Sequence, residues 1–319
     1  MNTNRTLIPI FFAIDDGYAP YLSVAVDSLI QNASPDYDYR IHIVHQGLSE
    51  ENQALLGKLA RGSAEIVFTE MTDTVKAITN REENLLRCDF FTLTIYFRLF
   101  LAQMFPQYDK GIYLDSDIVV PGDISQLYQT PLTEEQAIAA CPDFSIQGIP
   151  ELVHYLEQGI GVKRLEYINS GVLVMNFKFL RERRFDQRFL ALMNQYHFDT
   201  VAPDQDYLNA MLNGRIFYLD RCWDVMPEKG SAEHPAPKLI HYNLFDKPWC
   251  YSNIPYEDYF WHYAKRSAYY EKITAFRAGY CQAEQDAKTL SGLIEKAGRL
   301  PDGDITFRKL HEKGVQIRI

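Results

Sequence analysis

The sequence has few of the features that define several large classes of protein. Its cysteines form an odd set without close pairs: Cys88, Cys141, Cys222, Cys250 and Cys281. Such a set argues against a disulfide framework or a Cys-x-x-Cys zinc site and fits a reducing compartment. No stretch approaches the roughly 20 apolar residues of a membrane-spanning helix, and the first apolar run, interrupted by Pro9 and closed by Asp15 and Asp16, is unlike a signal peptide. We therefore expect a cytoplasmic protein.

Basic clusters and glycine-rich loops are also scarce. The net charge is -10, which argues against nucleic acid as a partner because phosphate backbones are bound by basic clusters. No Gly-x-Gly-x-x-Gly segment follows a predicted strand, so a dehydrogenase is disfavoured. The first predicted strand ends in the acidic segment 12–18 rather than in a basic, glycine-rich loop, which disfavours a nucleotidyltransferase.

Alternating strand and helix patterns fill the first two thirds of the chain. With 319 residues, 47% of them hydrophobic, the chain can bury a substantial core. Strands are predicted at 8–14, 40–45, 65–69, 111–114 and 137–141, and helices at 19–31 and 49–60, the second capped by Ser49. The alternation predicts an α/β fold. The nearly continuous apolar run at 8–14 predicts a sheet buried on both faces and therefore mostly parallel.

The character of the sequence changes near Pro255. Segments 260–273 and 283–299 look helical, and strand signals fade until the last few residues. Residues 260–319 hold 11 Lys/Arg against 7 Asp/Glu, a net +4 that leaves -14 for the rest. We predict a catalytic domain over 1–255 and a mainly helical C-terminal extension over 256–319.

Two carboxylates mark the most informative segment, residues 111–121, where an apolar run delivers Asp115 and Asp117 on either side of Ser116. Residues two apart in an extended chain share a face. Paired carboxylates at a strand end can hold a hard divalent cation that bridges the phosphates of a nucleotide-sugar. Ligands of α/β sheets bind at such strand ends.

The Asp-x-Asp spacing occurs four times in this acidic chain, so the spacing alone does not identify a site. The pairs at 36/38 and 302/304 each follow a proline and are typical of solvated turns. The pair at 204/206 follows Pro203 and also suits the start of a helix. Only the 115/117 pair lies between two apolar runs, where a charge without a cation or a hydrogen-bonded partner is costly.

Six blocks in order resemble glycosyltransferase family eight, the group that contains bacterial lipopolysaccharide galactosyltransferases, general stress protein A and glycogenin. The blocks are FAIDDGYAPYLSVAVDSL (12–29), LTIYFRL (93–99), YLDSDIVV (113–120), YINSGVLVMN (167–176), DQDYLN (204–209) and HYNLFDKPW (241–249). The resemblance spans about residues 7–250. It implies a GT-A-type fold with a mostly parallel central sheet and a metal-dependent transferase that takes a hexose from a UDP-sugar.

The resemblance also implies a donor site. Ala13, Asp15 and Tyr18 lie where the first predicted strand ends, and a carboxylate with an aromatic ring suits a uracil ring and its ribose. Arg98 matches the family's donor-binding arginine, and a guanidinium suits a diphosphate. Two alternatives stay open, because Asp15 alone also suits a helix N-cap and Arg98 also suits a buried salt bridge to Asp143 or a neighbour.

The HY…KPW block implies the remaining charges. It makes His241 the third metal ligand beside Asp115 and Asp117, and an imidazole next to two carboxylates favours Mn2+ over Mg2+. Lys247 would neutralise the departing diphosphate. The alternatives are a structural histidine and a surface lysine.

Residues around the transferred sugar follow from the same resemblance. Asn169, Asp204 and Gln205 match family positions there, and Asp143 follows a predicted strand at a corresponding position. Ser116, between the two carboxylates, is a further donor-binding candidate. Amides and carboxylates can hydrogen-bond sugar hydroxyls.

The resemblance further implies retention of the anomeric configuration. An inverting enzyme needs a strong general base opposite the diphosphate, and Gln205 is an amide. A double displacement would need Asp143 or Asp204 as nucleophile. We favour same-face attack, with the diphosphate oxygen taking the proton and Gln205 steadying the positive charge on the sugar through its carbonyl dipole.

Two departures from the family pattern affect the expected diphosphate loop. Gly17 stands where some relatives have asparagine, and Leu244 stands where many have glycine. Phe90 and Phe91 occupy a stretch that contacts acceptor in a galactosyltransferase relative, so the acceptor, a saccharide or a glycolipid, stays open.

A different class of function is a catalytically silent carbohydrate- or nucleotide-sugar-binding protein that uses its 21 tyrosines as stacking surfaces. The extension offers a further hypothesis, peripheral contact with the inner face of a membrane or with a polymeric acceptor through basic and aromatic side chains. The alternative is a helical cap packed on the domain. The side chains in question are Tyr259, Trp261, Tyr263, Lys265, Arg266, Tyr269 and Tyr270.

Overall fold

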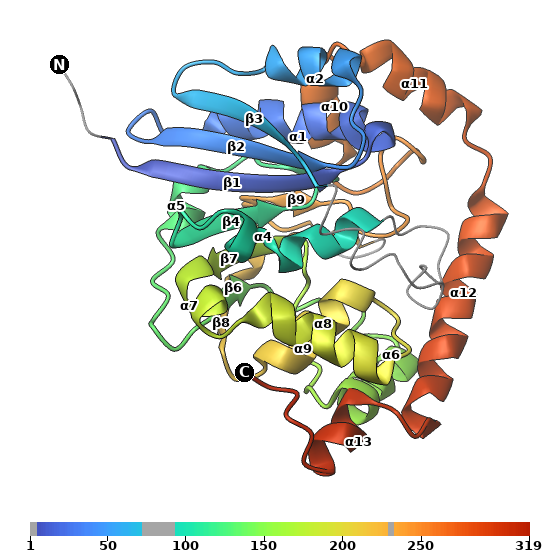
Figure 1. The fold of residues 1–319 in the computed structure, drawn as a ribbon. Helices are drawn as coiled ribbons and strands as arrows, with labels where there is room; N and C mark the ends of the chain where they lie inside the picture. Colours follow the sequence, from blue (N-terminus) through green and yellow to red (C-terminus); the bar gives the residue numbers. More distant parts are fainter. Residues whose placement is uncertain (1–4, 72–92, 229–232) are drawn as a thin grey trace.

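The computed structural model describes residues 5–71, 93–228 and 233–319 (Figure 1). Cys88, Phe90 and Phe91, which the sequence analysis singles out, lie outside these ranges. Among the helices that the model describes, none is long and apolar enough to cross a membrane.

A central sheet of seven strands confirms the predicted α/β class. The strand order is β3-β2-β1-β4-β7-β6-β8, and β7 runs antiparallel to its neighbours while the other pairs are parallel. The strands are β1 (Leu7–Ile14), β2 (Asp38–His45), β3 (Ala64–Glu70), β4 (Lys110–Leu114), β6 (Ile138–Ala140), β7 (Val172–Asn176) and β8 (Ile216–Tyr218). A separate small sheet pairs β5 (Ile118–Val119) with β9 (Ile240–His241).

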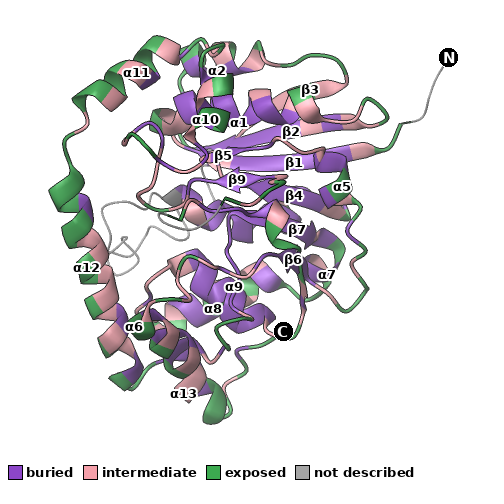
Figure 2. Ribbon diagram, turned by 180° about the vertical axis from the view of Figure 1, so that it is seen from behind, coloured by how far each residue is buried: buried purple, intermediate pink, exposed green. Residues whose placement is uncertain are grey.

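Strand β1 shows why the sheet is buried on both faces. Ile8, Ile10 and Phe12 pack into one hydrophobic cluster, whereas Phe11 belongs to the other, as the alternation of side chains along a strand requires. Figure 2 shows the inner strands buried along their length. The apolar run therefore serves two cores.

Helices cover both faces of the sheet (Figure 1). One side carries α1 (Ala19–Asn32) and α2 (Glu50–Gly57), and the Ser49 side chain caps α2 as predicted by accepting from Asn52 N–H. The other side carries α4 (Leu101–Met104), α7 (Phe177–Glu182), α8 (Phe185–Tyr196) and α9 (Pro203–Leu212). Shorter elements are the 3₁₀ helices η1 (Asp16–Tyr18), η3 (Leu93–Leu99), η5 (Arg221–Trp223) and η6 (Leu300–Asp302), the helices α5 (Ile124–Tyr128) and α6 (Pro150–His154), and the π-helical turn η4 (Tyr155–Ile160).

The C-terminal extension is helical, with two corrections. The predicted helix 260–273 is two helices, α10 (Glu257–Ala264) and α11 (Tyr270–Gly279), and the last few residues form no strand: Ile319 N–H donates to the Met211 carbonyl outside the sheet. Helix α12 (Ala283–Arg299) then runs along one side of the molecule to α13 (Phe307–Glu312). The division of the chain at residue 255 stays a prediction.

Part of the basic, aromatic surface expected on the extension is buried. Tyr263 and Tyr269 have 6% and 5% of their surface exposed. The Tyr263 hydroxyl accepts from the Asn32 amide, and the Tyr269 hydroxyl donates to the Asn52 side chain. Both tyrosines therefore fasten the extension to α1 and α2, as the alternative of a packed cap requires.

Candidate active site

The ends of three central strands meet at one edge of the sheet. Strands β1 and β4 are parallel neighbours, so Asp15 after β1 and Asp115 after β4 emerge together. Strand β7 is antiparallel, so the residues before it reach the same edge, where Asp115 N–H donates to the Gly171 carbonyl at 2.8 Å. Topology thus gathers segments that are far apart in the sequence.

Asp115, Asp117 and His241 form a compact group at this edge, with one ligand atom from each within 4.8 Å of the others. His241 Nε2 lies 3.3 Å from Asp117 Oδ1 and 3.9 Å from Asp115 Oδ2. The small sheet fixes this approach, because β5 follows Asp117 directly and Ile118 pairs with His241. Two carboxylate oxygens and an imidazole nitrogen at these separations suit adjacent ligands of one divalent cation, which lie roughly 3 Å apart.

Gly171 and Asp224 complete the surroundings of His241. A Cβ on Gly171 would lie 2.4 Å from His241 Cε1 and 2.7 Å from Asp115 Oδ2, so only glycine allows the two side chains to converge. His241 Nδ1 is 3.1 Å from Asp224 Oδ1, a fully buried carboxylate. A carboxylate behind a ligating imidazole fixes the ring and its tautomer.

The charges of this group set each other's protonation. Burial alone lowers the pKa of His241, but Asp117 and Asp224 outweigh it and raise that pKa well above its usual value. Burial raises the pKa of Asp117, yet Lys247 and His241 hold it well below its usual range. A cation that binds neutral imidazole would therefore displace a proton from His241.

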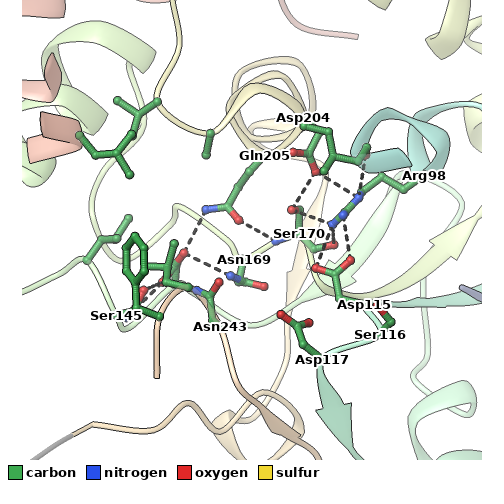
Figure 3. Close-up of a pocket in the computed structure, with 18 of the residues that line it drawn as sticks. Arg98, Asp115, Ser116, Asp117, Ser145, Asn169, Ser170, Asp204, Gln205 and Asn243 are labelled. Atoms are coloured by element: carbon green, nitrogen blue, oxygen red, sulfur yellow. Dashed lines mark hydrogen bonds and ion pairs between the residues drawn. The ribbon is translucent and has the colours of Figure 1, made fainter. Parts of the chain in front are cut away.

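Arg98 lies on the 3₁₀ helix η3, next to the carboxylates. Its guanidinium lies 2.8 Å from Asp115 Oδ1 and 3.1 Å from Asp204 Oδ2, and its carbon lies 4.4 Å from the centre of the Tyr113 ring. Figure 3 shows Arg98 between these two carboxylates. A buried salt bridge is thus present, but its partners are Asp115 and Asp204 rather than Asp143.

Lys247 pairs with the second carboxylate of the group, Asp117. Its Nζ lies 2.5 Å from Asp117 Oδ2 and donates to the Tyr242 carbonyl at 2.9 Å. The side chain is 14% exposed and lines the cavity, so the alternative of a free surface lysine is wrong.

A second set of polar side chains faces the cavity beyond the carboxylates (Figure 3). Gln205 donates from Nε2 to Asp143 Oδ2 at 3.0 Å and accepts at Oε1 from Ser170 N–H at 3.0 Å. Asn169 Nδ2 lies 3.3 Å from the same Asp143 oxygen. Asp204 pairs with Arg98 and accepts from the Ser170 hydroxyl at 3.0 Å. Among the residues that the structure describes, Asp143 is the carboxylate of this set that has no cationic partner.

The first strand supplies the remaining expected positions. Asp15 accepts from Gly17 and Tyr18 N–H groups at 3.0 and 3.2 Å, so it caps η1 as the alternative reading proposes, and it also lines the cavity. Ala13, Tyr18 and Ser116 line the cavity as well.

One cavity of about 250 Å³ gathers these positions. Every residue expected from the sequence at the donor, sugar or metal site lines it except His241, which lies buried behind Asp115 and Asp117. The other Asp-x-Asp pairs differ: Asp206 is buried and accepts from the Tyr155 and Tyr167 hydroxyls, and the pairs at 36/38 and 302/304 are not among the cavity's lining residues.

The two departures from the family pattern lie in different local surroundings. Leu244 adopts φ 55°, a left-handed conformation that glycine takes at no steric cost, and its side chain lines the cavity. A Cβ at Gly17 would be 3.3 Å from Asp15 Oδ1, a close contact that a small shift of the carboxylate relieves.

Three residues of the site were missed from the sequence. Asp224 lies between Trp223 and Val225, the same apolar setting that singled out Asp115, so the cost of an unpaired charge could have found it. Gly171 and Ser170 lie inside a matched block, but a small residue beside a strand gives no signal of the atoms that approach it.

Comparison with known proteins gives a family match over most of the chain. The model of glycosyl transferase family 8 matches residues 9–253. A putative glycosyltransferase of Haemophilus influenzae is 26% identical over 219 residues, which cover 68% of this chain and 63% of that protein. The lipopolysaccharide 1,2-glucosyltransferase of Escherichia coli K12 is 25% identical over 279 residues, covering 78% of this chain and 74% of that protein.

Solved structures show the same architecture. The galactosyltransferase LgtC in complex with donor and acceptor sugar analogues superimposes with a TM-score of 0.69 at 26% identity, covering 82% of this chain and 96% of that one. The apo bifunctional glycosyltransferase WbbM gives a TM-score of 0.72 at 22% identity over 88% of this chain and 53% of that one, a likeness of fold alone. Matched regions thus span under two thirds of some relatives, and 34% of GlyA of Streptococcus pneumoniae.

Proposed function

Because the chain belongs to glycosyl transferase family 8 and has a GT-A-type fold, we propose that it transfers a hexose from a UDP-sugar to a saccharide or glycolipid acceptor with the help of Mn2+. The observation that carries the proposal is the convergence of Asp115, Asp117 and His241 beside a cavity lined by Arg98 and Lys247. Two cationic side chains next to a cation site match the charge of a diphosphate.

The donor set of this site favours manganese. Two carboxylate oxygens and one imidazole nitrogen suit Mn2+ better than Mg2+, which prefers oxygen ligands and water. A bound cation supplies positive charge to the diphosphate as the bond to the sugar breaks. Asp224 holds the imidazole, and Lys247 is placed to move from Asp117 to the leaving phosphate.

Recognition of the nucleoside falls to the end of β1. Ala13, Asp15 and Tyr18 border the cavity next to the carboxylates, and we assign them to the uracil ring and the ribose. Asp15 keeps one side-chain oxygen beyond its cap to Gly17 and Tyr18. Ser116 lies between the two carboxylates in the sequence and lines the cavity, and we assign it to the diphosphate.

We assign the polar set around Asp143 to the transferred sugar and to a retaining reaction. Gln205 cannot act as a general base, and its Oε1 already accepts from Ser170 N–H, which leaves one lone pair for the sugar. Asp204 is neutralised by Arg98, so its salt bridge opposes a nucleophilic role. Same-face attack, in which the departing diphosphate oxygen takes the acceptor proton, agrees with both features.

Metal-dependent donor binding tests the proposal. Asp117→Asn should abolish Mn2+-dependent binding of UDP-sugars and turnover, because one of three ligands is lost. Asp36→Asn, at an exposed aspartate of another Asp-x-Asp pair, is the matched control and should behave as the parent protein. Screening UDP-glucose, UDP-galactose and UDP-N-acetylglucosamine identifies the donor. Full turnover in Asp117→Asn, or in excess chelator, contradicts the metal assignment.

The stereochemical assignment has its own test. NMR of the product from an α-linked donor should show an α-linkage, and a β-anomeric signal refutes retention. Gln205→Ala should lower kcat more than it weakens donor binding. The alternative function, a silent sugar-binding protein, predicts UDP-sugar binding without release of UDP. Membrane contact by the extension stays a prediction, which salt-sensitive sedimentation with anionic vesicles would test.

A further inference from the structure

Helix α12 carries an apolar stripe that its own packing leaves half-buried. Leu290, Leu293 and Ile294 are three and four residues apart, so they share one face of the helix. All three line the same cavity as Asp115 and Asp117. Within α12, the fully buried residues are Asp286 and Ala297. Within the part of the chain that the structure describes, the stripe therefore faces the cavity and does not fill a core.

The N-terminal end of α12 is fastened to the segment that carries Lys247. Asp286 Oδ2 accepts from the Tyr251 hydroxyl at 2.5 Å and from the Tyr280 hydroxyl at 2.7 Å. Tyr251 N–H in turn donates to the Lys247 carbonyl at 3.0 Å. The helix is thus tied to the donor side of the site.

The C-terminal end of α12 is fastened to the segment before α9. Lys296 Nζ donates to the Thr200 carbonyl at 2.6 Å and pairs with Asp199 at 2.8 Å. Helix α9 begins at Pro203 and carries Asp204 and Gln205 in its first turn. Contacts at both ends therefore fix the apolar stripe relative to the polar residues of the site.

The cavity thus has two walls of different chemistry. Asp143, Asn169 and Gln205 contribute carboxylate and amide groups to its lining, whereas the half-buried face of α12 contributes aliphatic side chains. A free saccharide would satisfy the first wall and leave the second facing hydroxyl groups. An alkyl chain attached to the sugar would instead cover the aliphatic wall and remove it from water.

We propose that this apolar wall binds the aglycone of the acceptor, so that the preferred acceptor is a glycoside whose sugar carries an alkyl chain. The proposal rests on the proposed function, because it takes the polar wall as the place where the reacting sugars lie. Leu293 and Ile294 are the residues that distinguish an alkyl glycoside from a free sugar.

Paired ligands test the proposal without knowledge of the natural acceptor. Isothermal titration of the full chain with UDP and Mn2+ would compare n-octyl β-D-glucoside, below its micelle concentration, with methyl β-D-glucoside. Burial of about two or three methylene groups corresponds to roughly 15- to 60-fold tighter binding of the octyl glycoside. Leu293→Asn should reduce this preference to less than about threefold. Lys288→Asn, on the exposed face of the same helix, should retain it.

Each outcome decides between the apolar wall and the donor site. Equal affinity of the parent protein for the two glycosides, or an undiminished octyl preference in Leu293→Asn, overturns the proposal. Leu290→Asn repeats the test at a second position if Leu293→Asn does not fold. The UDP affinity measured in the same titrations tests the proposed function separately. Mn2+-dependent UDP binding with no octyl preference counts against the apolar wall alone. Loss of UDP binding in the parent protein counts against the proposed function.

Discussion

Ion pairs at the candidate active-site edge of the sheet are buried, whereas those of the C-terminal extension are partly exposed to water. Arg98 pairs with Asp115 at 2.8 Å and has 5% of its side chain exposed. Arg266 in the extension pairs with Asp27 at the same distance, but 43% of its side chain is exposed. The pairs look alike in distance. They differ in the water removed from the guanidinium.

Burial, rather than distance, sets what such a pair does for the protein. Removing ions from water costs several kcal/mol for each ion, so a buried pair adds little net stability while the loss of one partner is severe. An exposed pair contributes about 0–1 kcal/mol. The ion pairs with the largest desolvation cost lie at the edge of the sheet, where we propose that a charged donor binds. The ion pair between Arg266 and Asp27, which joins the extension to α1, has a smaller desolvation cost.

Arg98→Met gives the largest expected effect. The substitution leaves the carboxylates of Asp115 and Asp204 without their buried cation, and breaking such a pair costs about 3–5 kcal/mol. Urea unfolding followed by circular dichroism measures the free energy of unfolding. A loss below about 1 kcal/mol would mean that water reaches Arg98 and that the two regions do not differ as described.

A buried neutral ring in the sheet gives the second effect. His42 stacks on Phe11 with ring centres 4.8 Å apart, and its Nε2 lies 3.1 Å from the Tyr108 hydroxyl. Its Nδ1 has no hydrogen-bond partner among the residues that the structure describes. Burial, with a smaller contribution from Arg40, lowers the pKa of His42 to about 4. The contribution of neutral His42 to the free energy of unfolding is therefore fully present above pH 6.5. It is lost as the pH falls from 6.5 to 4, and the loss is about 2–3 kcal/mol.

His42→Phe removes the titrating group and keeps an aromatic ring in the stack. The free energy of unfolding measured in urea at pH 4, 5, 6 and 7 should then depend less steeply on pH than in the parent protein. An unchanged slope would show that His42 already takes its proton in the folded state and that the sheet tolerates a buried charge there.

The same contrast explains which features the sequence could predict. Apolar runs located β1, β2, β3, β4 and the short β6, which was predicted at 137–141, and Ser49 marked the start of α2. The five-residue strand β7 was missed. The short strands β5, β8 and β9 have two or three residues each and exist only through their partners. The break between α10 and α11 gave no signal in the sequence. Tyr263 and Tyr269 flank it, and their hydrogen bonds to Asn32 and Asn52 are contacts with residues far away in the chain.

The residues of the site were recognisable by resemblance, but their partners were not. Nothing in the order of the chain says that Arg98 meets Asp204 rather than Asp143. The proximity of Asp117 and His241 depends on the pairing of β5 with β9, a contact between residues more than 100 apart in sequence. The role of Gly171 is visible only from the atoms that a Cβ would strike.

Asp224→Asn gives a smaller, site-specific effect. Asparagine keeps an oxygen near His241 Nδ1 but loses the charge that raises the basicity of the imidazole, and loss of such a carboxylate weakens metal affinity about 10- to 100-fold. Titration calorimetry with Mn2+ alone measures this affinity independently of turnover. Asp220→Asn is the matched control, because Asp220 is an exposed cap of η5. Equal affinities in the two variants would make Asp224 a structural residue.

Arg266→Met gives the smallest expected effect and tests the comparison from the side of the extension. Asp27 keeps a second partner, Arg61, at 2.7 Å, so no carboxylate is left alone when Arg266 is removed. The guanidinium also lies 5.1 Å from the centre of the Tyr263 ring, a contact that methionine partly preserves. We expect a loss of about 0.2–1 kcal/mol in urea unfolding at low salt, shrinking in 1 M NaCl because salt screens exposed charges. Arg98→Met, measured alongside, should keep its larger loss at both salt concentrations. A salt-independent loss above about 2 kcal/mol for Arg266→Met would show that a half-exposed pair can be as costly to break as a buried one, and burial would then not be the property that separates the two regions.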